Sequence, residues 1–382
     1  MGIKRLFSLL VLTFAVFGAS FFAIAKGEGN NTNTEVKPAE AKAGEAGEKE
    51  KNKLDVAGVI FGHIADAHEW HFFSIKHKDA EPTEVAMPLP CIIYSPSKGF
   101  FVFSSSKIEE GEGYEGFHLV RGAMKEKVVA YDGSPLYDVS VTKNVLSMIV
   151  GVVLLLWVML KAGKKYAANG AMKAPSGFQN FIEVVVVFLR DEVGKPCLGK
   201  KYERYMPLLL TIFFFIWINN LLGLLPGGAN FTGNIAVTAC LALLAFIVIL
   251  ANSKKTFWGH LFNPPGVPGW MKPMLVLIEL VSLFIKPMAL MIRLFANIMA
   301  GHIVILALIC IVFIFAAINT VVGAGFVPVS LAFAIFMFFL ELLVGAIQAF
   351  IFANLTAVFI GQAIEDPHDV HEAHGVAEEI SM

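Results

Sequence analysis

Five long apolar stretches in the second half of the chain constrain its fold more than any other feature. They cover residues 145–160, 206–225, 235–250, 273–317 and 329–364. A helix needs roughly 20 apolar residues to cross a bilayer, and the short first stretch is flanked by Lys143 and Lys161, whose stems can reach the interface. With 56% hydrophobic and 16% charged residues, the chain departs from the composition of a soluble domain. The sequence therefore predicts an all-α polytopic membrane protein with about five membrane helices.

The last two stretches are longer than a bilayer crossing requires. Both must be strongly tilted or broken, and Pro287 is the expected kink point in the first of them. Residues 178–191 show a different pattern, with apolar side chains at helical spacing and Glu183, Arg190 and Asp191 on the other face. This pattern is typical of an amphipathic helix that lies in the membrane interface.

Basic residues predict the orientation of the helices. Lys161, Lys164 and Lys165 follow the first stretch, and Lys254 and Lys255 follow the third. The short loop between the second and third stretches has no basic residue. Because positive charge marks the cytoplasmic side, we expect the amino terminus outside and the carboxyl terminus in the cytoplasm of a bacterium.

The first part of the chain divides into three segments by composition. Residues 1–25 have the basic start, apolar run and Ala-Ile-Ala site of a signal peptide, with an uncleaved anchor as the alternative. Residues 26–53 have almost no large apolar side chain and are predicted to be a flexible linker. Residues 54–143 alternate in short runs and predict a small β-rich periplasmic domain. The membrane domain is then 144–364, followed by a cytoplasmic tail, 365–382.

A cluster of possible metal ligands occurs in the predicted periplasmic domain: His63, Asp66, His68, Glu69 and His71. The spacing is not that of HExxH, so a polar surface patch is the favoured interpretation and metal binding the alternative. Elsewhere the four cysteines are scattered and no basic face indicates nucleic acid. No phosphate-binding loop motif occurs, so we expect no nucleotide chemistry, no cofactor and no metal on this chain.

Arg293 is the most unusual residue of the apolar stretches. A guanidinium at membrane depth costs several kcal/mol unless it faces a carboxylate or a water-filled cavity, and it stays charged. Asn297 lies four residues on, about 40° round the helix, and shares its face. Ala296 and Ala300 keep this face slim, so another helix can approach it closely.

Three further polar side chains occur in the last two stretches. His302 is nine residues from Arg293, about 180° round the helix, and therefore looks towards a different compartment. Glu341 and Gln348 are seven residues apart and share one stripe of the last helix. A carboxyl, an amide and an imidazole at membrane depth can form a proton relay. The alternative is that His302 and Glu341 only satisfy one another.

These residues resemble a known family, subunit a of F-type ATP synthases, over about residues 145–365. The motifs that carry the resemblance are Arg-Leu-Phe-Ala-Asn with Ala-Gly at 293–301, Gln-Ala-Phe-Ile-Phe at 348–352 and Asn-Leu-Leu-Gly-Leu-Leu-Pro at 220–226. The resemblance implies that Arg293 is the essential arginine, Asn297 the amide after it, and Gln348 the glutamine facing it. It also implies that His302 and Glu341 line the outer half-channel, although many bacterial relatives have the acid and the imidazole exchanged.

The function implied by the resemblance is proton translocation in the F0 sector of a rotary ATP synthase of the bacterial inner membrane. The implied partners are the c-subunit ring, the b-subunit peripheral stalk and the F1 sector, and the ion is H⁺ or Na⁺. One alternative is a secondary transporter that binds its own ion at Arg293, Glu341 and His302, although we find no internal repeat. An intramembrane metalloenzyme is a third, but the stretches lack HExxH.

Overall fold

The structure is a computed structural model that describes most of the chain from residue 60 to residue 364. The described residues are 60, 62, 64–75, 83–96, 99–108, 113–121, 126–132, 134–169, 176–225, 228–229, 231–263 and 268–364. The predicted signal peptide, linker and cytoplasmic tail lie outside these residues, as does His63.

Helices dominate the part that follows residue 142. They are α3 (Lys143–Asn169), α4 (Phe178–Phe188), α5 (Lys195–Leu198), α6 (Tyr202–Gly223), α7 (Ile235–Asn252), α8 (Lys255–Phe262), α9 (Lys272–Ile318) and α10 (Thr320–Ile364). Among the described residues, five helical segments are long and apolar enough to cross a membrane. The predicted fold class, a polytopic helical membrane protein, is confirmed.

The predicted amphipathic helix over residues 178–191 is present as α4, which ends at Phe188. The chain stays helical beyond residue 191. A wider helical segment, η2 (Leu189–Gly194), continues it into α5, and a 3-10 turn, η3 (Gly199–Lys201), leads on to α6. Leu189 and Val193 are buried in the helix bundle, so this connection is packed against the core. The position of α4 in the interface stays a prediction.

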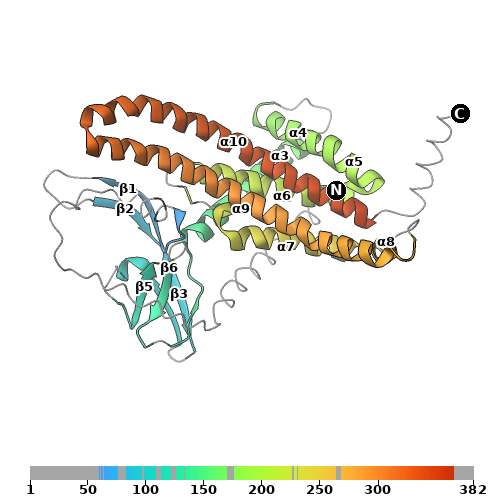
Figure 1. The fold of residues 1–382 in the computed structure, drawn as a ribbon, viewed down its shortest axis with the longest axis horizontal. Helices are drawn as coiled ribbons and strands as arrows, with labels where there is room; N and C mark the ends of the chain where they lie inside the picture. The colour runs from blue at the N-terminus through green and yellow to red at the C-terminus, as the bar shows by residue number, and fades with distance from the viewer. Residues whose placement is uncertain are drawn as a thin grey trace.

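Helices α9 and α10 form a long antiparallel hairpin (Figure 1). Each runs unbroken through an internal proline, Pro287 in α9 and Pro328 in α10. The expectation that α10 starts after Pro328, at residue 329, was wrong, because a proline is tolerated inside a membrane helix when its neighbourhood supplies other partners. A 47-residue helix is about 70 Å long. Since that is more than twice the hydrocarbon thickness, tilt and not a break must accommodate it.

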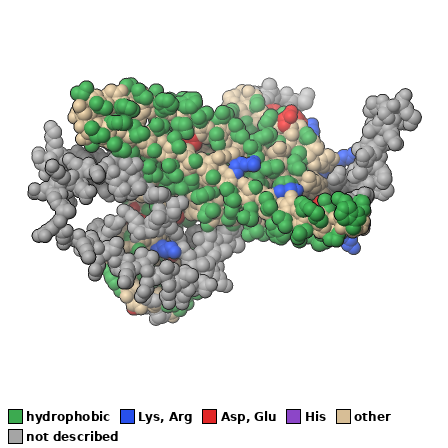
Figure 2. All heavy atoms as spheres, in the orientation of Figure 1, with side chains coloured by type: hydrophobic (Ala, Val, Ile, Leu, Met, Phe, Trp, Pro, Cys, Tyr) green, Lys and Arg blue, Asp and Glu red, His purple; other side chains and the backbone are tan. Residues whose placement is uncertain are grey.

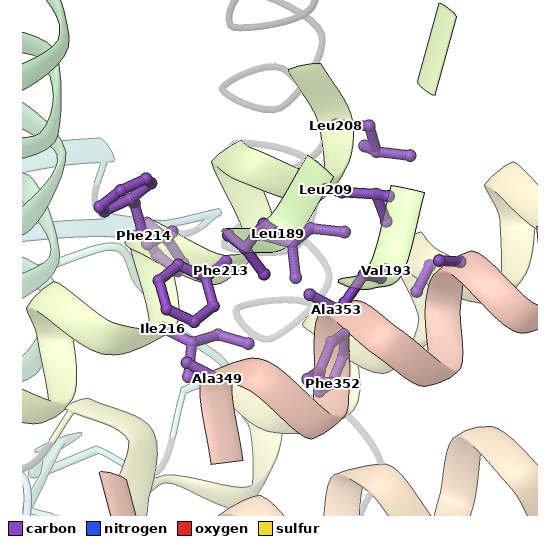
Figure 3. Close-up of a cluster of buried hydrophobic side chains, with 14 of the residues drawn as sticks. Leu189, Val193, Leu208, Leu209, Phe213, Phe214, Ile216, Ala349, Phe352 and Ala353 are labelled. Carbon is purple, nitrogen blue, oxygen red and sulfur yellow. The ribbon is translucent and has the colours of Figure 1, made fainter. Parts of the chain in front are cut away.

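The bundle core gathers where α6 and the α4–α5 connection meet the second half of α10. Figure 3 shows Leu189, Val193, Leu209, Ile216, Phe213 and Phe352 converging there with Ala349 and Ala353. Both alanines are fully buried, and their small side chains let the α10 backbone approach its neighbours. By contrast, the first half of α10 exposes large apolar residues such as Phe333 and Phe339, and Figure 2 shows hydrophobic side chains over much of the hairpin.

The amino-terminal part is a small β domain, as predicted. Its strands are β1 (Glu69–Ile75), β2 (Thr83–Pro88), β3 (Pro90–Ser95), β4 (Gly99–Ser104), β5 (Phe117–Arg121), β6 (Glu126–Ala130) and β7 (Tyr137–Asp138). They pair antiparallel in three small sheets, β1-β2, β4-β3-β7 and β5-β6. Alternate residues of β3, including Cys91 and Ile93, point into a core shared with Phe103 and Phe117.

Gly361 tests how closely α10 packs on the α5 segment. A Cβ at this position would lie 2.1 Å from the carbonyl oxygen of Cys197, a backbone atom that cannot turn away. We expect Gly361→Ala to destabilise the protein by about 1–3 kcal/mol or more, measured as a lower thermal unfolding midpoint in detergent. Gly325→Ala is the matched control on the same helix, because a Cβ there meets nothing within 4 Å. An unchanged midpoint for Gly361→Ala would contradict this packing.

Candidate functional site

Arg293 lies on an outward face of α9. Its side chain is exposed, and so are Ala296, Ala300 and Val304, which follow at helical spacing. Within the described part of the chain, the guanidinium makes no hydrogen bond and no ion pair. The described residues therefore present a permanent positive charge on a slim apolar helix face and supply no counter-charge to it.

His302 and Glu341 lie together on the other side of α9, inside the hairpin. His302 Nε2 is 3.7 Å from Glu341 Oε1, which is too long for a hydrogen bond. Only 5% of Glu341 is exposed, and neither carboxyl oxygen accepts a hydrogen bond from a described residue. The two side chains are nevertheless close enough to form an ion pair when the imidazole is protonated. Both interpretations of the pair, mutual satisfaction and a proton relay, therefore stay predictions.

Gly301 makes the close approach of Glu341 possible. A Cβ on residue 301 would lie 2.7 Å from both Cδ and Oε1 of Glu341. Since no side chain fits there, the glutamate can lie directly against the α9 backbone beside His302. The sequence motif included Gly301, but only the structure gives the reason for a glycine at this position.

Asn220 of α6 ties a third helix to this site. Its Nδ2 donates to the carbonyl oxygen of Gly345, at 3.2 Å, and its Oδ1 accepts from Thr232 Oγ1, at 2.9 Å. Gly345 is one helical turn from Glu341. The sequence interpretation used Asn220 only as part of a motif and did not use Thr232. An amide within the apolar stretch 206–225 was the sequence signal that could have found Asn220, which the structure shows to be buried.

Gln348 and Asn297, the two amides expected beside Arg293, lie on different helices of the hairpin. Gln348 is buried on α10, and Asn297 is half-buried on α9. Neither forms a hydrogen bond with the guanidinium in the portion that the structure describes. Whether they act on Arg293 therefore stays a prediction.

A second polar site, which the sequence analysis missed, lies on α9 between its amino-terminal end and Arg293. Glu279 and Lys286 line a cleft of about 630 Å³, including its open part, between α7, α8, α9 and α10. The ammonium of Lys286 lies 4.9 Å from the ring centre of Phe359. Glu279, Lys286 and Arg293 follow one another at seven-residue spacing, so they share a stripe of the helix. That spacing was the signal available in the sequence.

A family of known proteins matches the helical part. Residues 145–361, more than half of the chain, match the family model described as ATP synthase A chain.

The chain belongs to this family.

Similar proteins agree with this assignment. "ATP synthase subunit a" of Chloroherpeton thalassium is 44% identical over 246 residues, which is 63% of this chain and 72% of the relative. The protein of the same name from Chlorobium phaeobacteroides (strain BS1) is 43% identical over 244 residues, 63% and 70% of the two chains. The one from Myxococcus xanthus is 40% identical over 245 residues, 62% and 77%. The chain is thus a multi-pass membrane protein and the proton-translocating subunit of the F0 sector, and it functions within the F0/F1 complex.

The β domain belongs to a separate family match. Residues 59–145 match a model described as a domain of unknown function (DUF8433). The family of the membrane part therefore gives no role for the first 144 residues.

Two residues of the possible metal-ligand cluster, His68 and Asp66, belong to a polar network at the junction between the β domain and α3, whereas His71 is exposed. His68 is fully buried, with Nε2 3.2 Å from Asp138 Oδ2 and Nδ1 3.8 Å from Glu126 Oε2. The carboxylate of Asp66 accepts hydrogen bonds from the Thr142 hydroxyl, at 3.0 Å, and from the backbone N–H of Asn144, at 3.3 Å. The interpretation as a surface patch was wrong for His68 and Asp66. Among the described residues no group of three or more ligands could hold a metal ion.

Burial by itself would lower the pKa of His68, but the hydrogen bonds and charges of Asp138 and Glu126 outweigh it and raise the pKa from 6.5 to about 9. The imidazole is therefore protonated at neutral pH. Because the folded domain binds this proton more tightly than the unfolded chain, the stabilisation is complete below about pH 6.5 and is lost as the pH rises through 9.

We expect hydrogen exchange to detect this loss in β3, which lies in the domain core. After correction for the intrinsic exchange rate, the protection of β3 should fall by up to about 3 kcal/mol between pH 6.5 and pH 9. In the His68→Gln variant, the β3 amides should be less protected at pH 6.5, and their protection should no longer fall between pH 6.5 and pH 9. A decline of the same size in the variant would show that another group causes it.

The contact between Gly301 and Glu341 can be tested with paired substitutions. Gly301→Ala places a methyl group on the carboxyl, so we expect a large loss of ATP-driven proton pumping in inverted vesicles. Glu341→Asp withdraws the carboxyl by one methylene. The pumping rate of the double variant should therefore be higher than the rate expected if the two single substitutions reduced pumping independently. Gly163→Ala is the control, since a Cβ there meets nothing within 4 Å. Wild-type pumping by Gly301→Ala would refute the contact.

Proposed function

We propose that Arg293 faces the carboxylates of a c-subunit ring that turns beside α9 and α10. The observation that carries this proposal is the exposed guanidinium, which has no partner among the residues that the structure describes and lies on a face kept slim by Ala296 and Ala300. A fixed cation on an apolar membrane helix needs an acid from elsewhere, and a ring carboxylate supplies one. The small neighbours allow the ring helix to come close.

Two half-channels would lead to this arginine from opposite sides. The outer one contains His302 and Glu341, with Asn220 holding α6 against α10 beside them. The inner one is the cleft with Glu279 and Lys286. His302 and Lys286 are 16 residues apart on one helix, about 24 Å, and Arg293 lies between them. This order along α9 supports the idea of two separated cavities.

The mechanism is electrostatic. A proton enters past His302 and Glu341 and neutralises a ring carboxylate, which can then turn through the lipid. A protonated ring acid that meets Arg293 must ionise, because the guanidinium stabilises its charged form, and its proton leaves through the inner cleft. Each charge that crosses 100 mV carries about 2.3 kcal/mol, which becomes torque only if the arginine blocks direct passage. Gln348 and Asn297 would supply amide dipoles beside the passing carboxylate.

The proposed setting is the bacterial inner membrane. The β domain would lie in the periplasm and the tail after residue 364 in the cytoplasm, with the b-subunit stalk and F1 as further partners. Lys161, Lys164 and Lys165 at one end of α3 support this orientation. We propose the division into 1–25, 26–53, 54–143, 144–364 and 365–382, and the two family matches that meet at residue 145 support its main boundary.

Arg293→Ala tests the proposed role. We expect ATP synthesis driven by an imposed proton gradient to fall to background, because nothing then forces the ring acid to ionise. Lys164→Ala, which removes an exposed charge far along the chain, should leave synthesis unchanged. Co-purification of the ring with both variants verifies assembly. Wild-type synthesis rates with Arg293→Ala in an assembled enzyme would overturn the assignment.

A further inference from the structure

Two isoleucines at the start of the β domain pack on α9 beside the outer half-channel. Ile60 and Ile64, both 8% exposed, form an apolar cluster with the buried Met299. Phe295 and Ile303 of α9 pack against the same cluster, as do Leu306 and Ala307. The domain that matches a family of unknown function therefore touches the helix that carries Arg293 and His302.

The contact covers one of three distinct faces of α9. At 100° per residue, Phe295, Met299 and Ile303 lie within about 80° of one another, on a stripe away from Arg293. The Arg293 face is exposed, and the face of Gly301 is turned to Glu341 of α10. His302 falls at the border between the Gly301 face and the stripe that the isoleucines cover. The β domain thus closes the flank of the helix next to His302.

The chain around Ile64 is held firmly on the other side. Asp66, two residues on, binds Thr142 and the first turn of α3 through its carboxylate, and its carbonyl oxygen accepts from the Glu126 amide of β6. The Ala67 carbonyl accepts from the Lys143 amide. Because these bonds already fix the chain two residues from Ile64, the packing of Ile64 on α9 costs little additional conformational entropy.

We propose that the β domain is a permanent wall of the outer half-channel, with Ile60 and Ile64 as the residues that seal the flank of α9. The wall confines access to His302 and Glu341 to the bundle side of α9. It rests on the proposed outer half-channel, but its test does not depend on Arg293. The apolar character of the seal distinguishes it from a lid, since a lid would have to expose these isoleucines at each opening.

Thiol labelling tests the seal. In the assembled enzyme, with the four native cysteines replaced by alanine, Ile303→Cys reports access to the covered stripe. We expect a membrane-impermeant maleimide added outside to label it at least about tenfold faster when Ile64→Asp is introduced, the factor expected for losing one buried isoleucine. Val102→Asp, at a 59% exposed position of the same domain, is the control and should change nothing. Equal labelling in all three proteins would overturn the proposal.

A crosslink distinguishes a wall from a lid and does not require an undocked variant to fold. Oxidation of Ile64→Cys together with Met299→Cys should join the domain to α9 and leave ATP synthesis at the rate of the reduced form. Absence of the crosslink would overturn the contact, and synthesis that stops on oxidation and returns on reduction would overturn the permanent wall. A failure of the Arg293 assignment would leave both the labelling and the crosslink unchanged.

Discussion

A guanidinium that cannot lose its charge, set on an apolar helix face, is the constraint on which the rest of the structure depends. Arg293 finds no acid among the described residues of its own chain, and the helix around it is slim and exposed. We propose that this charge finds its acid in an assembly. The proposal agrees with the family of the membrane part, whose members work within the F0/F1 complex.

Three glycines set how closely the long helices approach one another. Gly301 lets Glu341 lie against α9, Gly345 admits Asn220 of α6, and Gly361 meets the backbone at Cys197. In each case the alternative is a methyl group against a neighbouring helix, and two of the three contacts are with polar side chains at membrane depth. The same small residues that bring helices together therefore also bring an acid, an imidazole and an amide into one region.

The β domain is joined to the membrane part by charge on one side and by apolar packing on the other. The network of Asp66, His68, Glu126 and the half-buried Asp138 lies at the start of α3, and Ile60 and Ile64 reach α9. A buried ion network is costly to assemble, and removing one of its partners is strongly destabilising. The β domain therefore contacts both the first membrane helix and the helix that carries the site.

The sequence by itself determined where the helices are and which one holds the arginine, because hydropathy, helical period and the cost of a buried charge are local properties. It also predicted the β-rich domain and the shared stripe of Glu341 and Gln348. It placed the start of the last helix after Pro328, whereas α10 begins at Thr320, because neighbours decide whether a helix tolerates a proline. The kink at Pro287 stays a prediction. Only the tertiary structure decided that Glu341 lies 3.7 Å from His302, that Asn220 belongs to the site, and that His68 is buried. These facts join residues about 40 to 125 positions apart, and no local pattern encodes which helices become neighbours.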